Sequence, residues 1–268
     1  MISKAVDLAV NDIERRLGVI AKQAGQCEKH GEFAVIIRKN GQSGCPACAQ
    51  EARDVQEHAD KQAEWERGAA VRLERKLGSA LIPRRFQGKT FSNYRAETET
   101  QQRNLSRCRE YAEQFARHRD DGRCIVMTGT PGTGKTHLAA AIAAHVAMYT
   151  SMTAVYRTVS SLLQFVKGSY GEKATYTEAQ AFASLVEPDL LILDEVGATK
   201  PSEYELATLF NVINGRYEDQ RPTIVISNLD HARLGEVLGE RSVDRLREGR
   251  GIGLVFDGGS HRLRKEAI

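Results

Sequence analysis

The sequence lacks an apolar run long enough to cross a membrane, and its first residues contain no hydrophobic signal core. Its five cysteines are an odd number, which does not suit a framework of paired disulfides. The net charge at pH 7 is only +3, which is too small to indicate a nucleic-acid partner by itself. These absences argue against membrane and disulfide-rich secreted classes, and we expect a cytoplasmic protein with no membrane partner.

A glycine-rich segment is the clearest motif in the chain. It matches the pattern G-x-x-x-x-G-K-[ST] and reads Gly129, Thr130, Pro131, Gly132, Thr133, Gly134, Lys135, Thr136. An apolar, strand-like run at 124–128 precedes it and a run of strong helix formers follows it, which is the context that this phosphate-binding loop requires. The alternative, a glycine-rich turn that binds nothing, fits these flanks poorly. Lys135 would reach the β- and γ-phosphates of ATP, and the Thr136 hydroxyl would ligate Mg²⁺.

Two acidic residues follow the next strongly apolar segment. Residues 189–195 read as a buried parallel strand that ends in Asp194 and Glu195. In a protein with a phosphate loop, the first acid positions Mg²⁺ and the second is placed to polarise the attacking water. The sequence therefore predicts ATP hydrolysis, with Glu195 as the general base.

A polar residue also ends the strand predicted at 223–228. Because parallel strands end on the ligand side of a sheet, Asn228 can reach the γ-phosphate or the lytic water. The competing interpretation is that Asn228 caps the helix that starts near Asp230.

Two Cys/His pairs near the N-terminus have the spacing of metal ligands. The ligands are Cys27, His30, Cys45 and Cys48, and residues 31–44 lie between the pairs. Three thiolates and one imidazole without an open position are typical of a closed, structural zinc site. The competing interpretation is a set of unrelated buried cysteines beside a surface histidine. The apolar run 33–37 followed by Asn40-Gly41 predicts a strand that enters a hairpin turn.

Helical spacing dominates the rest of the N-terminal region. Apolar residues recur three or four apart over 2–20 (Ile2, Val6, Ala9, Ile13, Leu17, Ile20), which predicts one helix that packs on the small domain or docks on a partner protein. Residues 49–80 predict a long, solvated helix, either single or paired as a coiled coil. We expect a helix-rich zinc-binding domain over 1–80, a linking segment over 81–98 and an α/β domain over 99–268. Helices are also expected over 100–118 and over 159–186, the second interrupted at 168–171.

Together, these motifs resemble the DnaC-type helicase loaders of the AAA+ class, including their phage-encoded relatives. The likeness covers about residues 82–268 and is carried by residues 82–86, 90–94, 129–136, 190–195, 227–229, 238–246 and 260–264. It implies a P-loop NTPase fold with a parallel central sheet flanked by helices. It also implies an ATPase that binds single-stranded DNA and delivers a hexameric, DnaB-type replicative helicase onto it.

The resemblance assigns further roles by position. Asn228 would be sensor 1, Arg241 the arginine finger that acts on a neighbouring subunit, and Arg262 the sensor 2 arginine. Tyr170, Ser202 and Tyr204 lie where the family contacts DNA, although ordinary surface tyrosines would look the same in the sequence. The family also implies that ATP orders the subunits into a ring segment or spiral and that the N-terminal domain grips the helicase.

Three other functions share some of these features. An IstB-like transposition helper has the same ATPase core, but a zinc knuckle beside a docking helix suits helicase delivery better. A P-loop small-molecule kinase needs no Asp-Glu pair followed by a sensor asparagine and an arginine supplied in trans. A DNA-binding zinc protein with a vestigial ATPase is disfavoured because Lys135, Thr136, Asp194 and Glu195 are all intact.

Overall fold

The computed structural model describes residues 7–199 and 201–261. The chain divides into two compact units, Met1–Val71 and Arg72–Ile268, and the division falls within the long helix α2 (Pro46–Ser79). The domain limits expected at residues 80 and 98 stay predictions. No helix among the described residues is both long and apolar enough to span a membrane.

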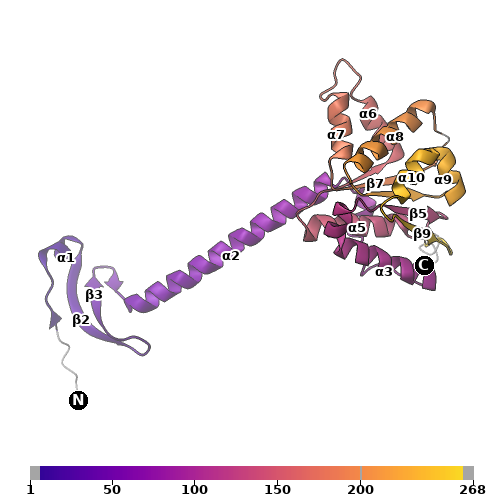
Figure 1. Ribbon diagram of the computed structural model, residues 1–268. Helices are drawn as coiled ribbons and strands as arrows, with labels where there is room; N and C mark the ends of the chain where they lie inside the picture. The colour runs from indigo at the N-terminus through magenta and orange to yellow at the C-terminus, as the bar shows by residue number, and fades with distance from the viewer. Residues whose placement is uncertain (1–6, 200, 262–268) are drawn as a thin grey trace, which may run out of the picture. The chain divides into compact units, whose positions relative to one another are not determined.

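The first unit is built on a four-stranded antiparallel sheet in the order β1-β2-β3-β4 (Figure 1). The elements before α2 are β1 (Asp7–Leu8), α1 (Asp12–Arg16), β2 (Val19–Cys27), β3 (Gly31–Arg38) and β4 (Gly41–Gln42). Cys27 pairs with Gly31 at one end of the β2–β3 hairpin, and Arg38 pairs with Gly41 around the next turn. The strand and hairpin turn predicted from residues 33–41 are therefore confirmed.

The single helix predicted over 2–20 is wrong for the residues that the structure describes; residues 1–6, with Ile2 and Val6, lie outside them. Only α1 is helical, and β2 begins at Val19. Gly18 has a φ of +78°, a conformation that ends the helix and that glycine adopts without strain. Strand pairing with β3 then decides the conformation, because a short periodic segment has too little helical stability to resist it. The first unit therefore owes its helix content mainly to α2, not to its N-terminus.

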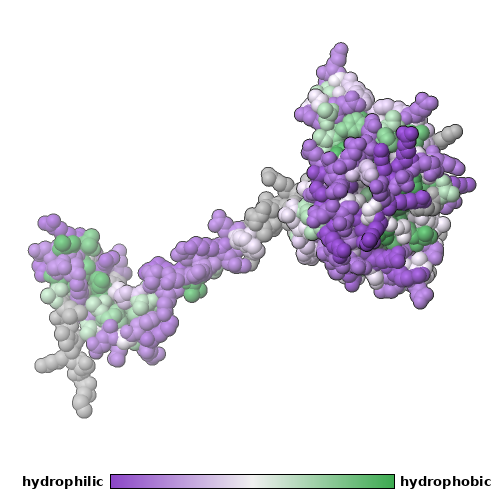
Figure 2. Space-filling model, viewed as in Figure 1, coloured by the Kyte–Doolittle hydropathy of each residue, from purple (hydrophilic) through white to green (hydrophobic). Residues whose placement is uncertain are grey.

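The predicted long helix is confirmed as α2. Pro46 occupies its first position, where a missing N–H costs no hydrogen bond. Most of its described side chains up to Trp65 are exposed, and hydrophilic residues cover most of its described part in the face shown in Figure 2. Directly after α2, the buried residue Ala80 accepts a hydrogen bond from Tyr156 N at 2.8 Å.

The second unit contains a five-stranded sheet in the order β6-β7-β8-β5-β9. Every neighbouring pair is parallel. The strands are β5 (Ile125–Gly129), β6 (Ala154–Thr158), β7 (Leu190–Val196), β8 (Thr223–Ser227) and β9 (Ile252–Phe256). The parallel sheet predicted for the ATPase region is confirmed, and β9 is an addition that no sequence motif had indicated.

Helices cover both faces of this sheet (Figure 1). One face carries α3 (Glu99–Glu113) and α5 (Lys135–Tyr149), with α4 (Phe115–Asp120) following α3. The other face carries α6 (Val159–Lys167), α7 (Glu178–Val186), α8 (Glu203–Glu218), α9 (His231–Leu238) and α10 (Glu240–Arg247). The helix predicted over 100–118 is divided at Gln114, and the gap between α6 and α7 is longer than the predicted one.

Two apolar clusters hold the three layers together. Ile125 and Met127 of β5 join the cluster under α3 and α5, whereas Val126 joins the cluster under α6–α10. Alternate residues of one strand face opposite sides, so a strand buried on both faces is apolar at every position. This packing places the carboxyl ends of β5, β7 and β8 side by side at one edge of the sheet.

Candidate nucleotide-binding and metal sites

The glycine-rich loop connects β5 to α5. Gly132 and Gly134 have φ values of +85° and +97°, which other residues rarely adopt. A Cβ at Gly132 would also lie 2.1 Å from Ser260 Oγ. His261 N donates to Gly132 O at 3.0 Å, and the Tyr94 hydroxyl donates to Thr133 O at 3.3 Å. The loop is therefore held in its open, concave shape by segments from both ends of the ATPase unit.

Lys135 lies across this loop and is only 4% exposed. Its Nζ donates to Gly129 O at 2.6 Å and to Thr130 O at 2.8 Å. Thr133 Oγ1 also donates to Thr130 O, at 2.8 Å. These contacts hold the ammonium group inside the loop, beside the α5 N-terminus whose N–H groups attract anions. The loop therefore has the shape and the charge of a phosphate site.

The two residues predicted to hold Mg²⁺ are in direct contact. Thr136 Oγ1 donates to Asp194 Oδ2 at 2.9 Å, and Glu195 N donates to Asp194 Oδ1 at 2.7 Å. The hydroxyl of Tyr156 donates to the same Oδ2 atom. A hydroxyl and a carboxylate are the hard oxygen groups that Mg²⁺ prefers, so this pair fits the ion. Sequence reasoning missed Tyr156, because nothing in its local pattern marks it as part of the site.

Glu195 sits beside Asp194 with an exposed side chain. Its φ is +61°, an uncommon conformation for a residue with a side chain, and the Asp194 carboxylate holds its N–H there. Such strained positions are concentrated at functional sites. The geometry therefore presents the predicted general base at the carboxyl end of β7.

Asn228 follows β8, the strand between β7 and β5, and its side chain is exposed. The residue that caps α9 is Asp230, whose side chain accepts from Arg233 N at 2.9 Å. The capping interpretation of Asn228 is therefore wrong, and its position at the nucleotide edge of the sheet suits a contact with phosphate.

The structure describes one of the two predicted arginines. Arg241 is the exposed second residue of α10, and none of the interactions recorded among the described residues joins it to the glycine-rich loop. Arg262 lies outside the described residues, so its predicted role stays a prediction.

Two of the three predicted DNA-contacting residues lie together in a surface cluster. Tyr204 OH donates to Tyr170 OH at 3.2 Å, and Tyr170 OH donates to Glu178 Oε1 at 2.6 Å. Lys167 Nζ lies 5.3 Å from the centre of the Tyr204 ring. Ser202 instead caps α8, where its hydroxyl accepts from Glu205 N at 3.3 Å. The structure thus brings two of the three predicted residues together and adds a cation that sequence reasoning had not named.

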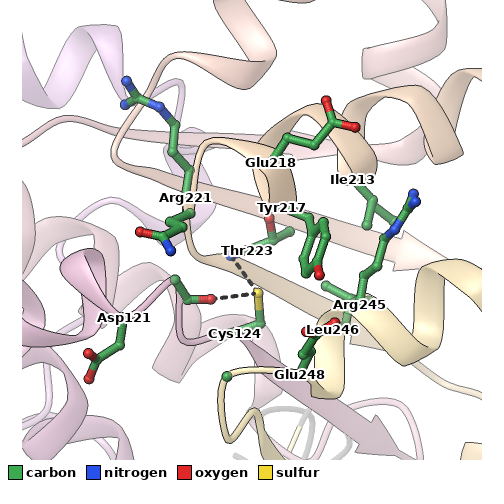
Figure 3. A pocket seen from close by; sticks show the side chains of 13 residues that line it. Asp121, Cys124, Ile213, Tyr217, Glu218, Arg221, Thr223, Arg245, Leu246 and Glu248 are labelled. Carbon is green, nitrogen blue, oxygen red and sulfur yellow. Dashed lines mark hydrogen bonds between the residues drawn. The ribbon is translucent and has the colours of Figure 1, made fainter.

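A cavity of about 310 Å³ lies at the other edge of the sheet (Figure 3). It is lined in part by Cys124 and Thr223, near the start of β5 and β8, and contains no predicted site residue. Cys124 Sγ is 3.5 Å from Gly122 O and 3.3 Å from Thr223 N. Burial raises the pKa of the Cys124 thiol, which is typical of a core cysteine and not of a reactive one.

In the first unit, the four predicted zinc ligands converge. The ligand atoms of Cys27, His30, Cys45 and Cys48 lie within 4.8 Å of one another. His30 Nδ1 is 3.7, 3.7 and 3.3 Å from the sulfurs of Cys27, Cys45 and Cys48, and the Cys27 and Cys48 sulfurs are 3.5 Å apart. A tetrahedron with metal–sulfur bonds of about 2.3 Å has edges of about 3.8 Å, so these four groups could hold zinc.

Two local features support metal binding at this cluster. Backbone N–H groups of Lys29 and His30 donate to the Cys27 sulfur and lower the pKa of that thiol to about 6, which favours the thiolate. His30 Nε2 lies 3.1 Å from Glu51 Oε1, while Lys29 Nζ lies 2.5 Å from the other Glu51 oxygen. A carboxylate on the far nitrogen of a histidine ligand is a common feature of zinc sites. Glu51 was not predicted, although it lies about one helical turn after Cys48.

The comparisons with known proteins agree with this geometry. Residues 54–265 match the family described as "IstB-like ATP binding protein". The chain is 33% identical over 193 residues to the replicative helicase loader DnaC of Buchnera aphidicola from Schizaphis graminum, covering 72% of this chain and 77% of the relative. It is 32% identical over 197 residues to the replicative helicase loader DnaC of Escherichia coli K12, covering 73% and 78%.

Solved structures share the fold. The crystal structure of the DnaC helicase loader aligns with a TM-score of 0.59 and 23% identity, covering 65% of this chain and all 100% of that one. AMPPCP-bound DnaA from Aquifex aeolicus aligns with a TM-score of 0.52 and 21% identity, covering 69% and 55%. The phosphate loop and the acidic pair lie on one sheet, and the family match covers both. The chain belongs to the IstB/DnaC-like family of ATP-binding AAA+ proteins.

Proposed function

We propose that this protein is an ATP-dependent loader that binds a replicative DNA helicase and delivers it onto single-stranded DNA during the initiation of replication. The observation that carries the proposal is the contact between Thr136 and Asp194 beside the strained Glu195, in a chain whose named relatives are replicative helicase loaders. This is the arrangement of an ATPase, and the relatives suggest the task that the ATPase serves.

In the proposed mechanism, each residue of the site has one role. Lys135 leaves the two loop carbonyls and pairs with the β- and γ-phosphates. Thr136 and Asp194 would hold Mg²⁺, which neutralises phosphate charge when it is bound. Glu195 accepts a proton from the attacking water, and Asn228 orients that water or the γ-phosphate.

Arg241 would complete the site of a neighbouring subunit. Its exposure on α10 leaves the guanidinium available to a second copy of the chain. An arginine supplied in this way stabilises charge on the γ-phosphate in the transition state. ATP would then order the subunits into a ring segment or spiral, and hydrolysis would loosen the loader from the helicase and the DNA. Arg262, as sensor 2, would act within the same site.

Single-stranded DNA would be held at the cluster of Tyr170, Tyr204 and Lys167, near the N-terminus of α8 that Ser202 caps. Aromatic rings stack on unpaired bases without reading their sequence, and a nearby ammonium group attracts the backbone phosphates. A loader needs this kind of sequence-independent contact.

The first unit would bind zinc through Cys27, His30, Cys45 and Cys48 and would contact the helicase. Ile13, Leu17 and Ile20 are 71%, 66% and 64% exposed. These three apolar side chains are therefore available to a partner, although the segment is not the single helix that its spacing predicts. Large exposed apolar side chains grouped in a short segment are typical of protein interfaces.

Co-purification of a hexameric replicative helicase with the full-length chain tests the proposal. We expect capture in the presence of ATP and Mg²⁺, and hydrolysis that rises with protein concentration and with single-stranded DNA. Glu195→Gln should trap the complex by abolishing turnover, whereas the exposed control Glu203→Gln on α8 should behave as wild type. Arg241→Ala should reduce hydrolysis but spare ATP binding, with Arg233→Ala on α9 as its control.

A second candidate is an ATPase that assists transposition, because the family description names IstB-like proteins. No capture of the helicase by the full-length chain with ATP, together with ATP-dependent binding to a transposase, would favour that function. Turnover in the Glu195→Gln variant at the wild-type rate would instead contradict the assignment of the general base in both candidates.

A further inference from the structure

We propose that Tyr156 is a positioning residue for the ATPase site and that its hydroxyl fixes the Asp194 carboxylate for Mg²⁺. This role rests on the proposed ATPase function. Tyr156 lies on β6, the strand next to β7, and its hydroxyl donates to Asp194 Oδ2. The phosphate-loop hydroxyl of Thr136 donates to the same oxygen at 2.9 Å.

The contact is buried on both sides. Tyr156 is 3% exposed and Asp194 is 5% exposed, so water cannot easily replace the phenol as a donor. A buried carboxylate that loses a hydrogen bond retains the cost of its desolvation, which makes each remaining donor important.

The three donors to Asp194 come from different parts of the unit. Thr136 belongs to the loop that must adjust when phosphates enter, and Glu195 is the neighbour in the chain. Tyr156 is the donor that comes from another strand of the sheet. It can therefore hold the carboxylate in one orientation while the loop changes its contacts.

The backbone of Tyr156 is fixed on both edges of β6. On one side it is in register with Ile192 of β7, and on the other its N–H donates to Ala80 O at 2.8 Å. Ala80, Tyr156 and Ile192 all belong to the apolar cluster under α3 and α5. The ring therefore has little freedom to swing away from Asp194, as a positioning role requires.

Tyr156→Phe tests this role because it removes only the hydroxyl. The first readout is binding of a fluorescent ATP analogue across a titration of Mg²⁺, and the second is hydrolysis. We expect binding without Mg²⁺ to change by less than about twofold, because the phosphate loop is intact. The Mg²⁺ concentration for half-maximal binding should rise about tenfold, the lower end of the losses seen when groups that orient metal ligands are removed.

Tyr111→Phe is the matched control. Tyr111 is 1% exposed, and its hydroxyl donates to Arg123 O at 2.7 Å, before the start of β5 and away from Asp194. We expect the two variants to lose similar stability and Tyr111→Phe to keep the wild-type Mg²⁺ dependence. Equal, wild-type Mg²⁺ dependence in both variants would overturn the positioning role and leave Tyr156 as a core residue.

A second measurement covers the case in which Tyr156→Phe does not fold. In wild-type protein with isotope-labelled tyrosine rings, addition of Mg²⁺ to the complex with a non-hydrolysable ATP analogue should shift the Tyr156 signal more than the Tyr111 signal. Equal shifts would overturn the role. Nucleotide binding by the wild type that does not respond to Mg²⁺ would overturn the proposed ATPase itself, and that result appears before any substitution is made.

Discussion

The two units of this protein are stabilised in different ways. The ATPase unit has an apolar cluster on each face of its sheet, with side chains such as Leu138 and Leu162 fully buried. In the first unit, among residues whose side chains the structure describes, the buried apolar residues are Val19, Val35 and Cys45. Such a small core cannot offset the entropy cost of ordering the chain. We therefore expect a metal to stabilise the first unit and packing to stabilise the second.

Removal of zinc should have the largest effect on stability, and the effect should be confined to the first unit. A chelator should abolish the thermal transition of the first unit, because structural zinc contributes on the order of 10 kcal/mol to the folding of such domains. The ATPase unit should melt at an unchanged temperature. Calorimetry and circular dichroism with and without chelator measure both transitions. A single thermal transition of the whole protein that the chelator does not change would contradict this difference between the two units.

Arg216→Met should have the next largest effect, and it should be confined to the ATPase unit. Arg216 is 0% exposed, and its guanidinium donates to Thr223 Oγ1 and to the carbonyls of Leu185, Val186, Pro188 and Pro222. Methionine fills the space but leaves these acceptors unpaired, at about 1–3 kcal/mol for each buried group. We expect the unfolding free energy of this unit to fall by about 5 kcal/mol in denaturant titrations.

The exposed residue Arg233 supplies the control for this substitution. Arg233→Ala should stay within about 0.5 kcal/mol of wild type, as surface substitutions usually do. If Arg216→Met lost no more stability than Arg233→Ala, the hydrogen bonds of Arg216 would not hold α7 and β8 together as its contacts indicate.

Glu51→Ala should have a smaller effect, confined to the first unit. Loss of the carboxylate 3.1 Å from His30 Nε2 leaves the four ligands in place but frees the imidazole to rotate. We expect zinc affinity to fall about tenfold, measured by competition with a chromophoric chelator. Glu57 is the control because its carboxylate pairs with Lys61 on the same helix. Glu57→Ala should leave zinc affinity unchanged. Equal affinities for the two variants would exclude a role for Glu51.

The smallest effect should be a pH dependence of the ATPase unit. Burial lowers the pKa of His118, and nearby Arg123 lowers it further. The unfolded chain therefore binds a proton at this histidine more readily than the folded chain does. The contribution of neutral His118 to stability is complete above the ordinary histidine pKa of about 6.5 and decreases as the pH falls below it. Melting curves from pH 7.5 to 5.5 should show this loss in wild type. His118→Phe, which keeps the ring stacked on Tyr111, should show less of it.

Much of the nucleotide site was predictable because its parts are local. Residues 129–136 and Asp194 stand in segments whose strand and helix preferences agree with the final fold. The same holds for Cys27, His30, Cys45 and Cys48, where spacing alone indicates two metal-binding turns. The helix predicted over 2–20 failed because its periodicity was a local signal that pairing between β2 and β3 overrode.

The sequence by itself determined the phosphate loop, the acidic pair and the four metal ligands, because short-range spacing and residue chemistry specify them. Only the tertiary structure decided that Tyr156 holds Asp194, that Glu51 holds His30 and that Asp230 caps α9 in place of Asn228. The Tyr156 and Glu51 contacts join residues 38 and 21 positions apart. They depend on which strands lie side by side and where a helix starts, and the packing of the whole unit decides both.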